Sequence, residues 1–552
     1  MNHSLLLLTA ALLLGGSAEA QNISGRITCK GKGLKGVAVS DGYNIVVTDS
    51  TGRYEMNSGK QLGLVYYSIP GGYQPEMKDG FRPQFWASLR SADSLVNEVH
   101  DFALRRVKNQ RFRMAIGTDS HLANRAGDIQ QFNDMFVASL RRETKKAKKV
   151  PVYSMLLGDI TWDRYWVKNN YDLNAFLQTC REAKYPVPLW TVMGNHDNDP
   201  SVPYTTELET DLRAEGKWRG IMGPNYYSFN LGKVHFVVLD DISYTNKPKA
   251  NGKYDPGVVG KRDYRPYLNY RQMSWLKRDL ELIADSTTPI IIATHAPILT
   301  DNRVVPARPG FNLSTSSSEL MLELLRRFPK VHIVSGHKHT NTSNISPYYP
   351  NVQEHNINAL CGIMWDSFNS SGKHNCMDGT PGGYYLWNVD GDSLHWEFKT
   401  MDGKECNQFR IYDMNTVRKF YADNPTLRAM LKKYPDRTDF AQYADNIVLV
   451  NVYALAPGWK VEVLEDGQLL KSRRIYEEDP YHVLCHDIIA FKEKGSIIPD
   501  RAGKKNMHMI RCKTTSAHKP VTVRVTDSFG RVYERTIQRP HPYSLEMEAL
   551  EK

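Results

Sequence analysis

The sequence predicts an α/β protein in three parts: a central α/β/α sandwich, an N-terminal β-sandwich and a C-terminal domain that is mostly β. Short apolar runs alternate with amphipathic helical patterns between residues 108 and 400, which is typical of a layered fold with mostly parallel strands. Several of these runs end directly in Asp, Asn or His, and strand ends are where such folds build their sites. A chain of 552 residues is also too long for one hydrophobic core.

Residues 1–20 are interpreted as a signal peptide. Their apolar run, Leu5 to Leu14, is too short to span a bilayer. It is followed by Ala18-Glu19-Ala20, a small-x-small cleavage pattern. No later run is long and apolar enough to predict a membrane span. We therefore expect an exported protein, periplasmic or secreted.

The composition is that of an ordinary soluble protein with an excess of basic residues. The formal net charge is +11, and loss of Glu19 with the first 20 residues changes the sum to 71 − 59 = +12. This charge favours anionic substrates, but the absence of a basic-aromatic stripe argues against nucleic acid as a partner. Seven scattered cysteines do not make a disulfide scaffold. If one bridge forms, Cys361 with Cys376 is the pairing we expect.

Residues 22–107 are predicted to form the N-terminal β-sandwich. Gly-rich turns such as Gly31-Lys32-Gly33 and Gly71-Gly72 separate short β-rich runs. The stretches 34–42 and 48–54 resemble the carboxypeptidase-regulatory type of sandwich. No catalytic cluster occurs here, so a spacer or docking role is the favoured interpretation.

The central domain, residues 108–400, carries four amphipathic helical patterns. Apolar residues recur at helical spacing in 128–148, 173–182, 272–283 and 318–328. A tight corner at Leu231-Gly232 joins two further strands. His235 and His332 lie inside apolar strands, where a hydrogen-bonded histidine in the core or on a strand face is the favoured interpretation over a metal ligand.

The C-terminal domain, residues 401–552, returns to a β pattern. Strands are predicted at 446–454, 459–464, 521–526 and 532–537, after a helical stretch at 415–433. His482, Cys485 and His486 have a spacing that could suit a metal. They lack a second ligand pair in range, so packed residues are the favoured interpretation.

The strand ends of the central domain supply seven oxygen and imidazole donors. They are Asp119 and His121 after run 113–118, Asp159 after 152–158, Asn195 after 189–194, His295 after 289–294, and His337 and His339 after 331–336. A donor set without thiolate suits two divalent ions such as Mn, Fe or Zn. Asp159 is the natural bridge, because a carboxylate can hold two ions at once. Such a pair can generate a bridging hydroxide that attacks phosphorus in line with the leaving group.

His196 is the candidate general acid for the leaving alkoxide, or a donor to the charge that develops in the transition state. It follows a ligand, and strand alternation predicts that its side chain points to the other face. A carboxylate would fix its tautomer. Asp163 and Asp197 are both candidates for this partner, and the sequence does not choose between them.

These residues carry a resemblance to a known family. Five short blocks occur in the family's order: Asp119-x-His121, Gly158-Asp159, Gly194-Asn195-His196-Asp197, Thr294-His295-Ala296 and Gly336-His337-x-His339. The sequence resembles the calcineurin-like metallophosphoesterases, and the flanking β-domains resemble those of exported bacterial members. The resemblance implies an α/β/α sandwich with a dinuclear metal centre. One metal would take Asp119, His121, Asp159 and His339, the other would take Asp159, Asn195, His295 and His337, and His196 matches the catalytic histidine.

Two positions depart from the family pattern. Family members often carry an Asp three residues after the bridging carboxylate, whereas this chain has Trp162 there and Asp163 next to it. Purple acid phosphatases carry a ligating Tyr at that position and lack the histidine of the first block. Because this chain has Trp162 and His121, it does not resemble a tyrosinate–iron enzyme.

The sequence thus predicts a dinuclear, metal-dependent phosphoesterase acting on phosphate monoesters or diesters. A nuclease of the same superfamily is one alternative, and a catalytically inert carbohydrate- or surface-binding protein is another. Stoichiometric transition metal would separate the enzyme from the inert protein. Substrate contacts are expected from the segment 358–383, which is rich in Gly, Asp, Asn and aromatic residues. Trp365, His374 and Asp378 are its candidates, although a surface loop is an equal alternative.

Overall fold

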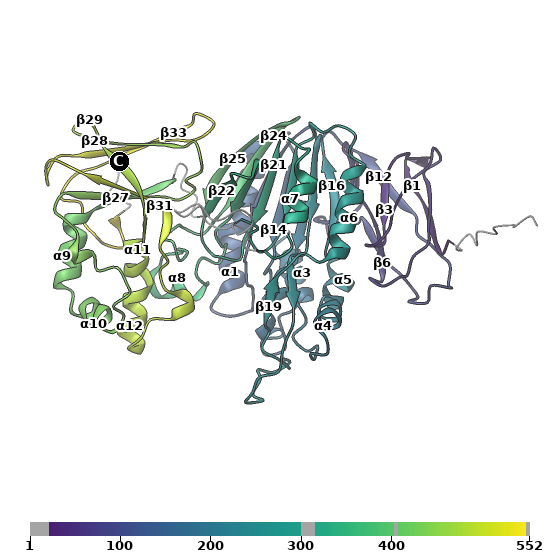
Figure 1. Ribbon diagram of the computed structural model, residues 1–552, viewed down its shortest axis with the longest axis horizontal. Coiled ribbons are helices and arrows are strands. Elements are labelled where there is room, and N and C mark those ends of the chain that lie inside the picture. The colour runs from purple at the N-terminus through teal and green to yellow at the C-terminus, as the bar shows by residue number, and fades with distance from the viewer. Residues whose placement is uncertain (1–20, 300–314, 402–406, 548–552) are drawn as a thin grey trace, which may run out of the picture.

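The computed structural model describes residues 21–299, 315–401 and 407–547. The predicted signal peptide, residues 1–20, lies outside the described residues. Figure 1 displays three regions in a row, with an α/β region between a strand-rich N-terminal region and a strand-rich C-terminal region. The predicted fold class is confirmed. In the described ranges, no helix combines the length and the apolar character needed to cross a membrane.

The N-terminal region is a β-sandwich whose two sheets enclose small apolar side chains and tyrosines. One sheet contains β1 (Ile23–Cys29), β2 (Lys32–Gly33), β5 (Arg53–Met56), β7 (Tyr73–Pro75), β11 (Glu98–Val99) and β12 (Phe102–Arg106). The other contains β3 (Ala38–Ser40), β4 (Ile45–Val47), β6 (Leu64–Tyr67) and β10 (Trp86–Ser88), while β8 (Met77–Lys78) pairs with β9 (Arg82–Pro83). In β5, Tyr54 and Met56 point inward between exposed neighbours, as expected for a strand with one buried face.

The β layer of the central region, in the part of the chain described, consists of two sheets. The first is ordered β15 (Leu189–Val192), β14 (Val152–Leu157), β13 (Arg111–Gly117), β24 (Gly383–Asp390), β25 (Ser393–Thr400). The second is ordered β16 (Tyr227–Leu231), β17 (Val234–Val238), β20 (Ile290–Ala293), β21 (Val331–Ser335), β23 (Tyr349–Asn356), β22 (Thr342–Ser346). The strands that lead to the predicted donors lie in two parallel sets. These are β13, β14 and β15 in the first sheet, and β17, β20 and β21 in the second.

Side-chain alternation explains why helices cover the outer faces of both sheets. In β13, Met114 and Ile116 pack in the core that includes Phe236 and Ile291 of the second sheet. Ala115, between them, packs instead with Phe136 from the helical segment that follows. Both faces of each sheet are therefore buried, which requires the continuous apolar runs seen in the sequence.

Helices occur in the four predicted ranges of the central region. The helices of this region are α1 (Asp128–Phe132), a π-helical turn (Asn133–Val137), α2 (Ala138–Ala147), α3 (Leu173–Glu182), α4 (Glu207–Ala214), α5 (Gly216–Ile221), α6 (Tyr270–Glu281), α7 (Glu319–Leu325) and α8 (Asp366–Ser371). Of these, α4, α5 and α8 are additional helices that the sequence patterns did not predict. The start of α3 is fixed by Asp172, whose side chain accepts hydrogen bonds from the N–H groups of Asn174 and Ala175. The strand pair around Leu231-Gly232 is also confirmed.

The N-terminal sandwich is docked on the outer side of the second sheet. The Trp275 indole of α6 donates to Ser40 Oγ at 3.1 Å, and Tyr226 Oη donates to the Gly42 carbonyl at 2.6 Å. Tyr66 also contacts the Trp275 ring. The two regions thus share one hydrophobic core, so the sandwich is held in a fixed place relative to α6.

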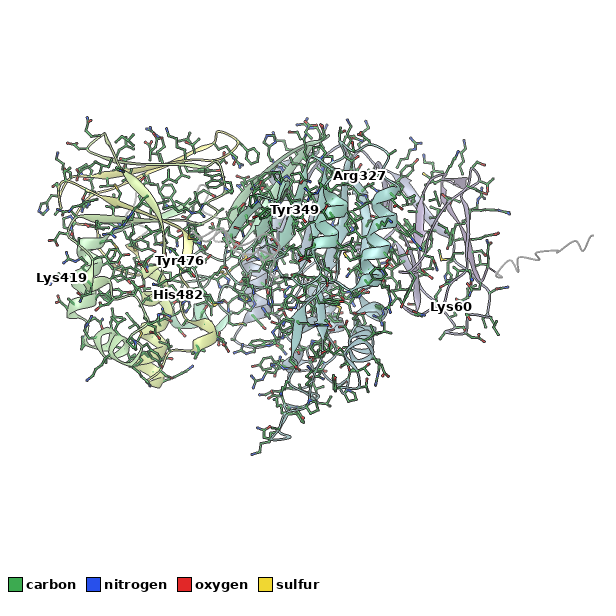
Figure 2. The ribbon with its side chains drawn as sticks, in the orientation of Figure 1. Lys60, Arg327, Tyr349, Lys419, Tyr476 and His482 are labelled. Atoms are coloured by element: carbon green, nitrogen blue, oxygen red, sulfur yellow. The ribbon has the colours of Figure 1, made fainter. Side chains whose placement is uncertain are left out.

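The C-terminal region pairs two sheets with a helical cluster. Its sheets are β26 (Phe409–Asp413), β27 (Ile447–Val452), β31 (Asn506–Lys513), β30 (Ser472–Glu477) and β29 (Gln468–Leu470), β28 (Lys460–Glu465), β32 (Val521–Thr526), β33 (Val532–Ile537). Its helices are α9 (Met414–Asp423), α10 (Pro425–Lys433), α11 (Pro480–His482) and α12 (Ile488–Lys494), with a π-helical turn at Val483–Asp487. His482, labelled in Figure 2, is buried with its ring nitrogens 3.0 Å from the Cys376 carbonyl and 3.1 Å from the Arg501 carbonyl. The packed interpretation of this histidine is confirmed.

Two sequence expectations about core side chains have different outcomes. His235 faces Asp279 Oδ2 at 2.8 Å and His332 faces His355 at 3.2 Å, as expected for histidines in the core or on a strand face. The pairing of Cys361 with Cys376 is wrong, because both are free thiols. Each sulfur instead lies near a backbone carbonyl, that of Gly362 or Ala359.

A buried ion pair stabilises the N-terminal sandwich. Lys60 Nζ (labelled in Figure 2) lies 2.9 Å from Glu98 Oε1, and the two side chains are 0% and 1% exposed. Burial alone would raise the pKa of Glu98. The N–H groups of Arg90 and Ser91 and the Lys60 ammonium overcome this effect and lower that pKa to about 2. Glu98 therefore contributes stability that is present above pH 4.5, its ordinary pKa, and is lost as the pH falls towards 2.

We expect Glu98→Gln to lower the free energy of unfolding of this region by about 3–5 kcal/mol at pH 7, because it leaves a buried ammonium unpaired. Denaturant titrations between pH 7 and pH 2 measure the effect, and the variant should lose less stability than wild type below pH 4.5. Glu55→Gln is the control, since Glu55 is exposed on β5 and should change stability by less than about 0.5 kcal/mol. Equal effects of the two substitutions would contradict the prediction.

Candidate metal centre

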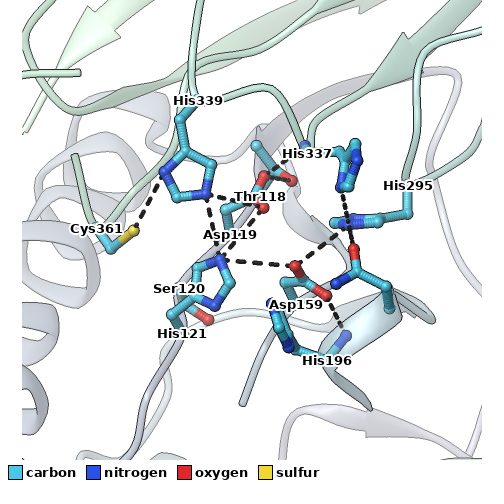
Figure 3. A network of polar contacts seen from close by, with 12 residues as sticks. Thr118, Asp119, Ser120, His121, Asp159, His196, His295, His337, His339 and Cys361 are labelled. Carbon is cyan, nitrogen blue, oxygen red and sulfur yellow. Dashed lines mark hydrogen bonds and ion pairs between the residues drawn. The ribbon is translucent and has the colours of Figure 1, made fainter. Parts of the chain in front are cut away.

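The ends of five strands from both sheets bring the seven predicted donors together. Asp119, His121, Asp159 and Asn195 follow strands of the first sheet, whereas His295, His337 and His339 follow strands of the second. Figure 3 displays the imidazoles gathered around the carboxylates of Asp119 and Asp159. The cluster thus lies where the carboxyl ends of the two sheets meet.

One group of donors surrounds Asp119 Oδ1. His339 Nε2 lies 3.3 Å from this oxygen and His121 Nε2 lies 3.5 Å from it. The two imidazole nitrogens are 3.2 Å apart. His121 Nε2 is also 3.6 Å from Asp159 Oδ2.

A second group of donors surrounds His295. Its Nε2 lies 3.3 Å from Asp159 Oδ2, 3.0 Å from Asn195 Oδ1 and 3.2 Å from His337 Nδ1. Asp159 Oδ2 therefore faces both groups. Donor atoms of Asp159, His295 and His337 lie within 4.8 Å of one another, a spacing that could hold a metal ion.

The backbone of the donor loops is unusual. Five donors have positive φ values: Asp119 (53°), His121 (41°), Asp159 (48°), His337 (70°) and His339 (51°). Non-glycine residues seldom adopt this conformation, and it persists where the surrounding structure imposes it, most often at functional sites. The sharp turns after β13, β14 and β21 direct these five side chains towards the common centre.

Glycines next to the donors allow the loops to approach one another. A Cβ on Gly194 would lie 2.2 Å from the Asp159 backbone nitrogen, and one on Gly336 would lie 1.9 Å from Thr118 Oγ1. Gly158 has a φ of 88° and also lies against Gly194. These contacts explain the glycine that precedes the donor in three of the five blocks.

Outer hydrogen bonds orient the imidazoles. His295 Nδ1 faces the Leu157 carbonyl at 2.8 Å, and His339 Nδ1 faces the Gly362 carbonyl at 2.9 Å. A carbonyl can only accept, so each Nδ1 carries a proton, and in the neutral ring each Nε2 presents a lone pair to the cluster. This arrangement is characteristic of metal-ligating histidines.

The electrostatics of the cluster favour a cationic occupant. Burial alone would raise the pKa of Asp119, but the imidazoles of His339 and His121 hold it well below its usual range. Burial would likewise lower the pKa of His295, yet the carboxylates of Asp159 and Asp119 raise it to about 10. The ionised carboxylates thus draw positive charge into a buried space.

The residues fit a pair of divalent ions. Asp119 Oδ2 accepts hydrogen bonds from Thr118 Oγ1 and the His337 N–H. Asp119 Oδ1 is buried and has no hydrogen-bond partner within the described residues, although Nε2 of His121 and Nε2 of His339 lie 3.5 and 3.3 Å from it. An oxygen left open beside imidazole nitrogens is suited to a metal such as Mn, Fe or Zn.

His196 lies beside the cluster with Asp163 as its partner. His196 Nδ1 is 2.8 Å from Asp163 Oδ1, and its backbone N–H donates to Asp159 Oδ1 at 2.7 Å. The residues Asn195–Asp197 form a 3-10 turn, so strand alternation was the wrong basis for the orientation of His196. The turn directs this side chain away from the Asn195 donor.

Asp197 has a different position from that of Asp163. Its oxygens accept hydrogen bonds from the N–H groups of Gly194 and Thr161 at 3.0 and 3.1 Å. Burial and the nearby Asp159 carboxylate raise the pKa of Asp197 to about 7. Asp197 therefore ties together the loops that follow β14 and β15.

The structure places the three substrate-contact candidates in contacts within the protein. Trp365 is buried and its indole donates to the Ser120 carbonyl at 2.6 Å, while His374 stacks on it. Asp378 is 0% exposed and binds His508 Nε2 at 3.1 Å. The Trp365 indole and the Asp378 carboxylate are thus engaged inside the protein, and a substrate contact by these three residues stays a prediction.

Several residues near the donors were missed by the sequence interpretation. Asp241 Oδ1 accepts hydrogen bonds from the N–H groups of His295 and Ala296 at 3.0 and 3.2 Å. Tyr264 Oη lies 3.4 Å from His337 Nε2, and Arg262 contacts Asp163. These residues follow no donor-bearing strand and match no block, so no sequence signal distinguished them. Cys361 lies 3.9 Å from His339 Nδ1, and the sequence interpretation placed it in a disulfide instead.

Comparison with known families identifies the chain. Residues 112–341 match the family "Calcineurin-like phosphoesterase", residues 21–107 match its N-terminal extension, and residues 354–533 match its C-terminal extension. The chain belongs to the calcineurin-like phosphoesterases, a family that uses a dinuclear metal centre.

Individual relatives are distant. The human serine/threonine-protein phosphatase CPPED1 is 26% identical over 201 residues, which cover 36% of this chain and 56% of that protein. Purple acid phosphatase 15 of Arabidopsis thaliana is 23% identical over 34% of this chain and 35% of its own length. A dimetal phosphatase structure from Danio rerio aligns with a TM-score of 0.34 and 16% identity, over 52% of this chain and 96% of that one. The chain therefore spans 56% of the length of human CPPED1 and 35% of the length of purple acid phosphatase 15.

We expect Gly194→Ala to abolish stoichiometric metal binding, because the added Cβ would displace the Asp159 backbone and carboxylate. Elemental analysis of the purified protein measures the effect. Gly220→Ala in α5 is the matched control, since an added Cβ there meets nothing within 4 Å, and it should retain the wild-type metal content. A fully loaded Gly194→Ala protein would contradict this description of the loop contact.

Proposed function

We propose that this chain hydrolyses phosphate esters in a reaction that depends on two divalent metal ions. The observation that carries the proposal is the position of Asp159, whose Oδ2 faces His121 at 3.6 Å and His295 at 3.3 Å. It can therefore join two ions in one centre. Membership of the calcineurin-like phosphoesterases supports the same reaction class.

The proposed ligands divide between the two ions as in the family. Asp119, His121, Asp159 and His339 would hold one, and Asp159, Asn195, His295 and His337 would hold the other. When bound, the ions supply charge that polarises the phosphoryl oxygen and lowers the pKa of the attacking water. The donor set suits Mn, Fe or Zn.

His196 is proposed to protonate the leaving oxygen. Its Nδ1 is directed to Asp163 at 2.8 Å, so the tautomer that donates from Nδ1 is favoured in the neutral ring and Nε2 is free for the substrate. Burial opposes protonation of the ring, but the carboxylates of Asp159 and Asp163 raise the pKa of His196. The side chain is 23% exposed, which leaves it accessible to an ester. Asp163 is the proposed orienting partner, and Asp197 is proposed to support the loops.

The proposed substrate is a phosphomonoester or phosphodiester outside the cytoplasm. The net charge of +11 suits an anionic ester.

We also propose that residues 1–20 direct export, on the cleavage pattern Ala18-Glu19-Ala20. We expect the amino terminus of protein recovered from the periplasm or medium to be Gln21, as measured by N-terminal sequencing. Recovery of the intact chain from the cytoplasm alone would contradict export.

We expect Asp159→Ala to lose metal and nearly all turnover, whereas His196→Ala should retain metal and lose activity by about 10²–10⁴-fold. Metal analysis and assays on p-nitrophenyl phosphate and its bis-ester measure both effects. Wild-type protein treated with a chelator is the control and should behave as Asp159→Ala does until Mn, Fe or Zn is restored. Full turnover by the chelated, metal-free protein would reject the proposed function.

A further inference from the structure

Arg262 reaches the proposed metal centre from a segment outside the ligand blocks. It lies in the arm that joins β18 (Ile242–Tyr244) to β19 (Tyr264–Pro266). Its guanidinium Nη1 lies 2.8 Å from Asp163 Oδ1 and 3.4 Å from His196 Nδ1. Arg262 thus touches both members of the His196–Asp163 pair.

The backbone around Arg262 is fixed by buried contacts. Arg262 has a φ of 59°, and its N–H donates to Asn246 Oδ1 at 3.0 Å. Asn246 is 0% exposed, and its Nδ2 donates to the carbonyls of Pro200 and Val202 at 3.1 and 2.7 Å. A left-handed arginine persists only where its surroundings impose it. The arm is therefore anchored on the segment that follows the turn carrying His196.

Donors converge on one oxygen of Asp163. Asp163 Oδ1 lies 2.8 Å from each of three donor atoms: His196 Nδ1, Arg262 Nη1 and the backbone nitrogen of Arg164. Asp163 Oδ2 is buried and has no hydrogen-bond partner in the described ranges. The carboxylate has a side-chain exposure of 0%, so its orientation depends on these donors. Removal of Arg262 would leave Asp163 Oδ1 with two donors, His196 Nδ1 and the Arg164 N–H.

We propose that Arg262 is a positioning residue: it holds the Asp163 carboxylate so that His196 keeps Nδ1 on Asp163 and presents Nε2 to the leaving oxygen. This inference rests on the proposed function. The proposed role of Arg262 differs from that of a purely structural ion pair in one respect. Loss of Arg262 should impair protonation of the leaving group more than it impairs folding, metal binding or substrate binding.

The test compares Arg262→Gln and Arg262→Lys on a series of esters with p-nitrophenyl, phenyl and benzyl leaving groups. Poor leaving groups need the proton most. We expect Arg262→Gln to lower kcat by about 100-fold for the benzyl ester and by less than about 5-fold for the p-nitrophenyl ester. KM, metal content and Tm should stay close to wild type, and Arg262→Lys should recover part of kcat because it retains the charge.

Arg265→Gln is the matched control, because exposed Arg265 lies on the same hairpin and pairs with half-buried Glu207 at 3.2 Å. It should keep kcat for every ester within about two-fold, as surface ion pairs contribute little. A second readout does not depend on turnover. The NMR signal of the His196 Nδ1 proton should exchange with water faster in Arg262→Gln than in Arg265→Gln, in metal-free as well as metal-loaded protein.

The outcomes separate the inference from the proposed function. An equal loss of kcat for all leaving groups, a rise in KM alone, or an unchanged exchange rate of the His196 proton would each overturn the positioning role. If wild type hydrolyses none of the esters, the proposed function fails. The exchange measurement then decides by itself whether Arg262 fixes the His196–Asp163 pair.

Discussion

The structure depends on the placement of one buried carboxylate between imidazoles from two separate sheets. Asp159 follows β14 in the first sheet and reaches His295, which follows β20 in the second. A buried carboxylate is costly unless positive charge lies beside it. The parallel strands, the left-handed donor residues and the close glycine contacts together bring that charge within reach. The rest of the fold holds the carboxyl ends of the two sheets in this arrangement.

The fold class could be predicted from the sequence because the β layer is buried on both faces. Continuous apolar runs such as 152–157 and 290–293 have no exposed side in the structure, so they were distinct from the amphipathic helices around them. The division of the β layer into two sheets was not predicted. It depends on which strands pair, and pairing is a property of long-range packing that periodicity does not record.

The candidate site was predicted in its inner part and missed in its outer part. The metal donors follow strands directly, and Asp163 was one of two candidates for the partner of His196. The sequence could not choose between Asp163 and Asp197, because their difference arises from a 3-10 turn and not from strand alternation. Arg262 and Asp241 come from segments that match no motif. Trp365 and Asp378 had the composition of a substrate loop but are buried by tertiary packing.

The division of the donors between two sheets has a consequence for the energetics of the whole protein. In the proposed assignment each ion would take ligands from both sheets, so an ion would act as a cross-link between layers that are also joined by apolar contact and by hydrogen bonds such as that of the His337 N–H to Asp119. Binding of such ions and folding of the sandwich are then thermodynamically linked. Loss of metal would loosen the interface between the layers as well as stop catalysis. The resistance of this protein to heat would therefore depend on the supply of metal in its surroundings.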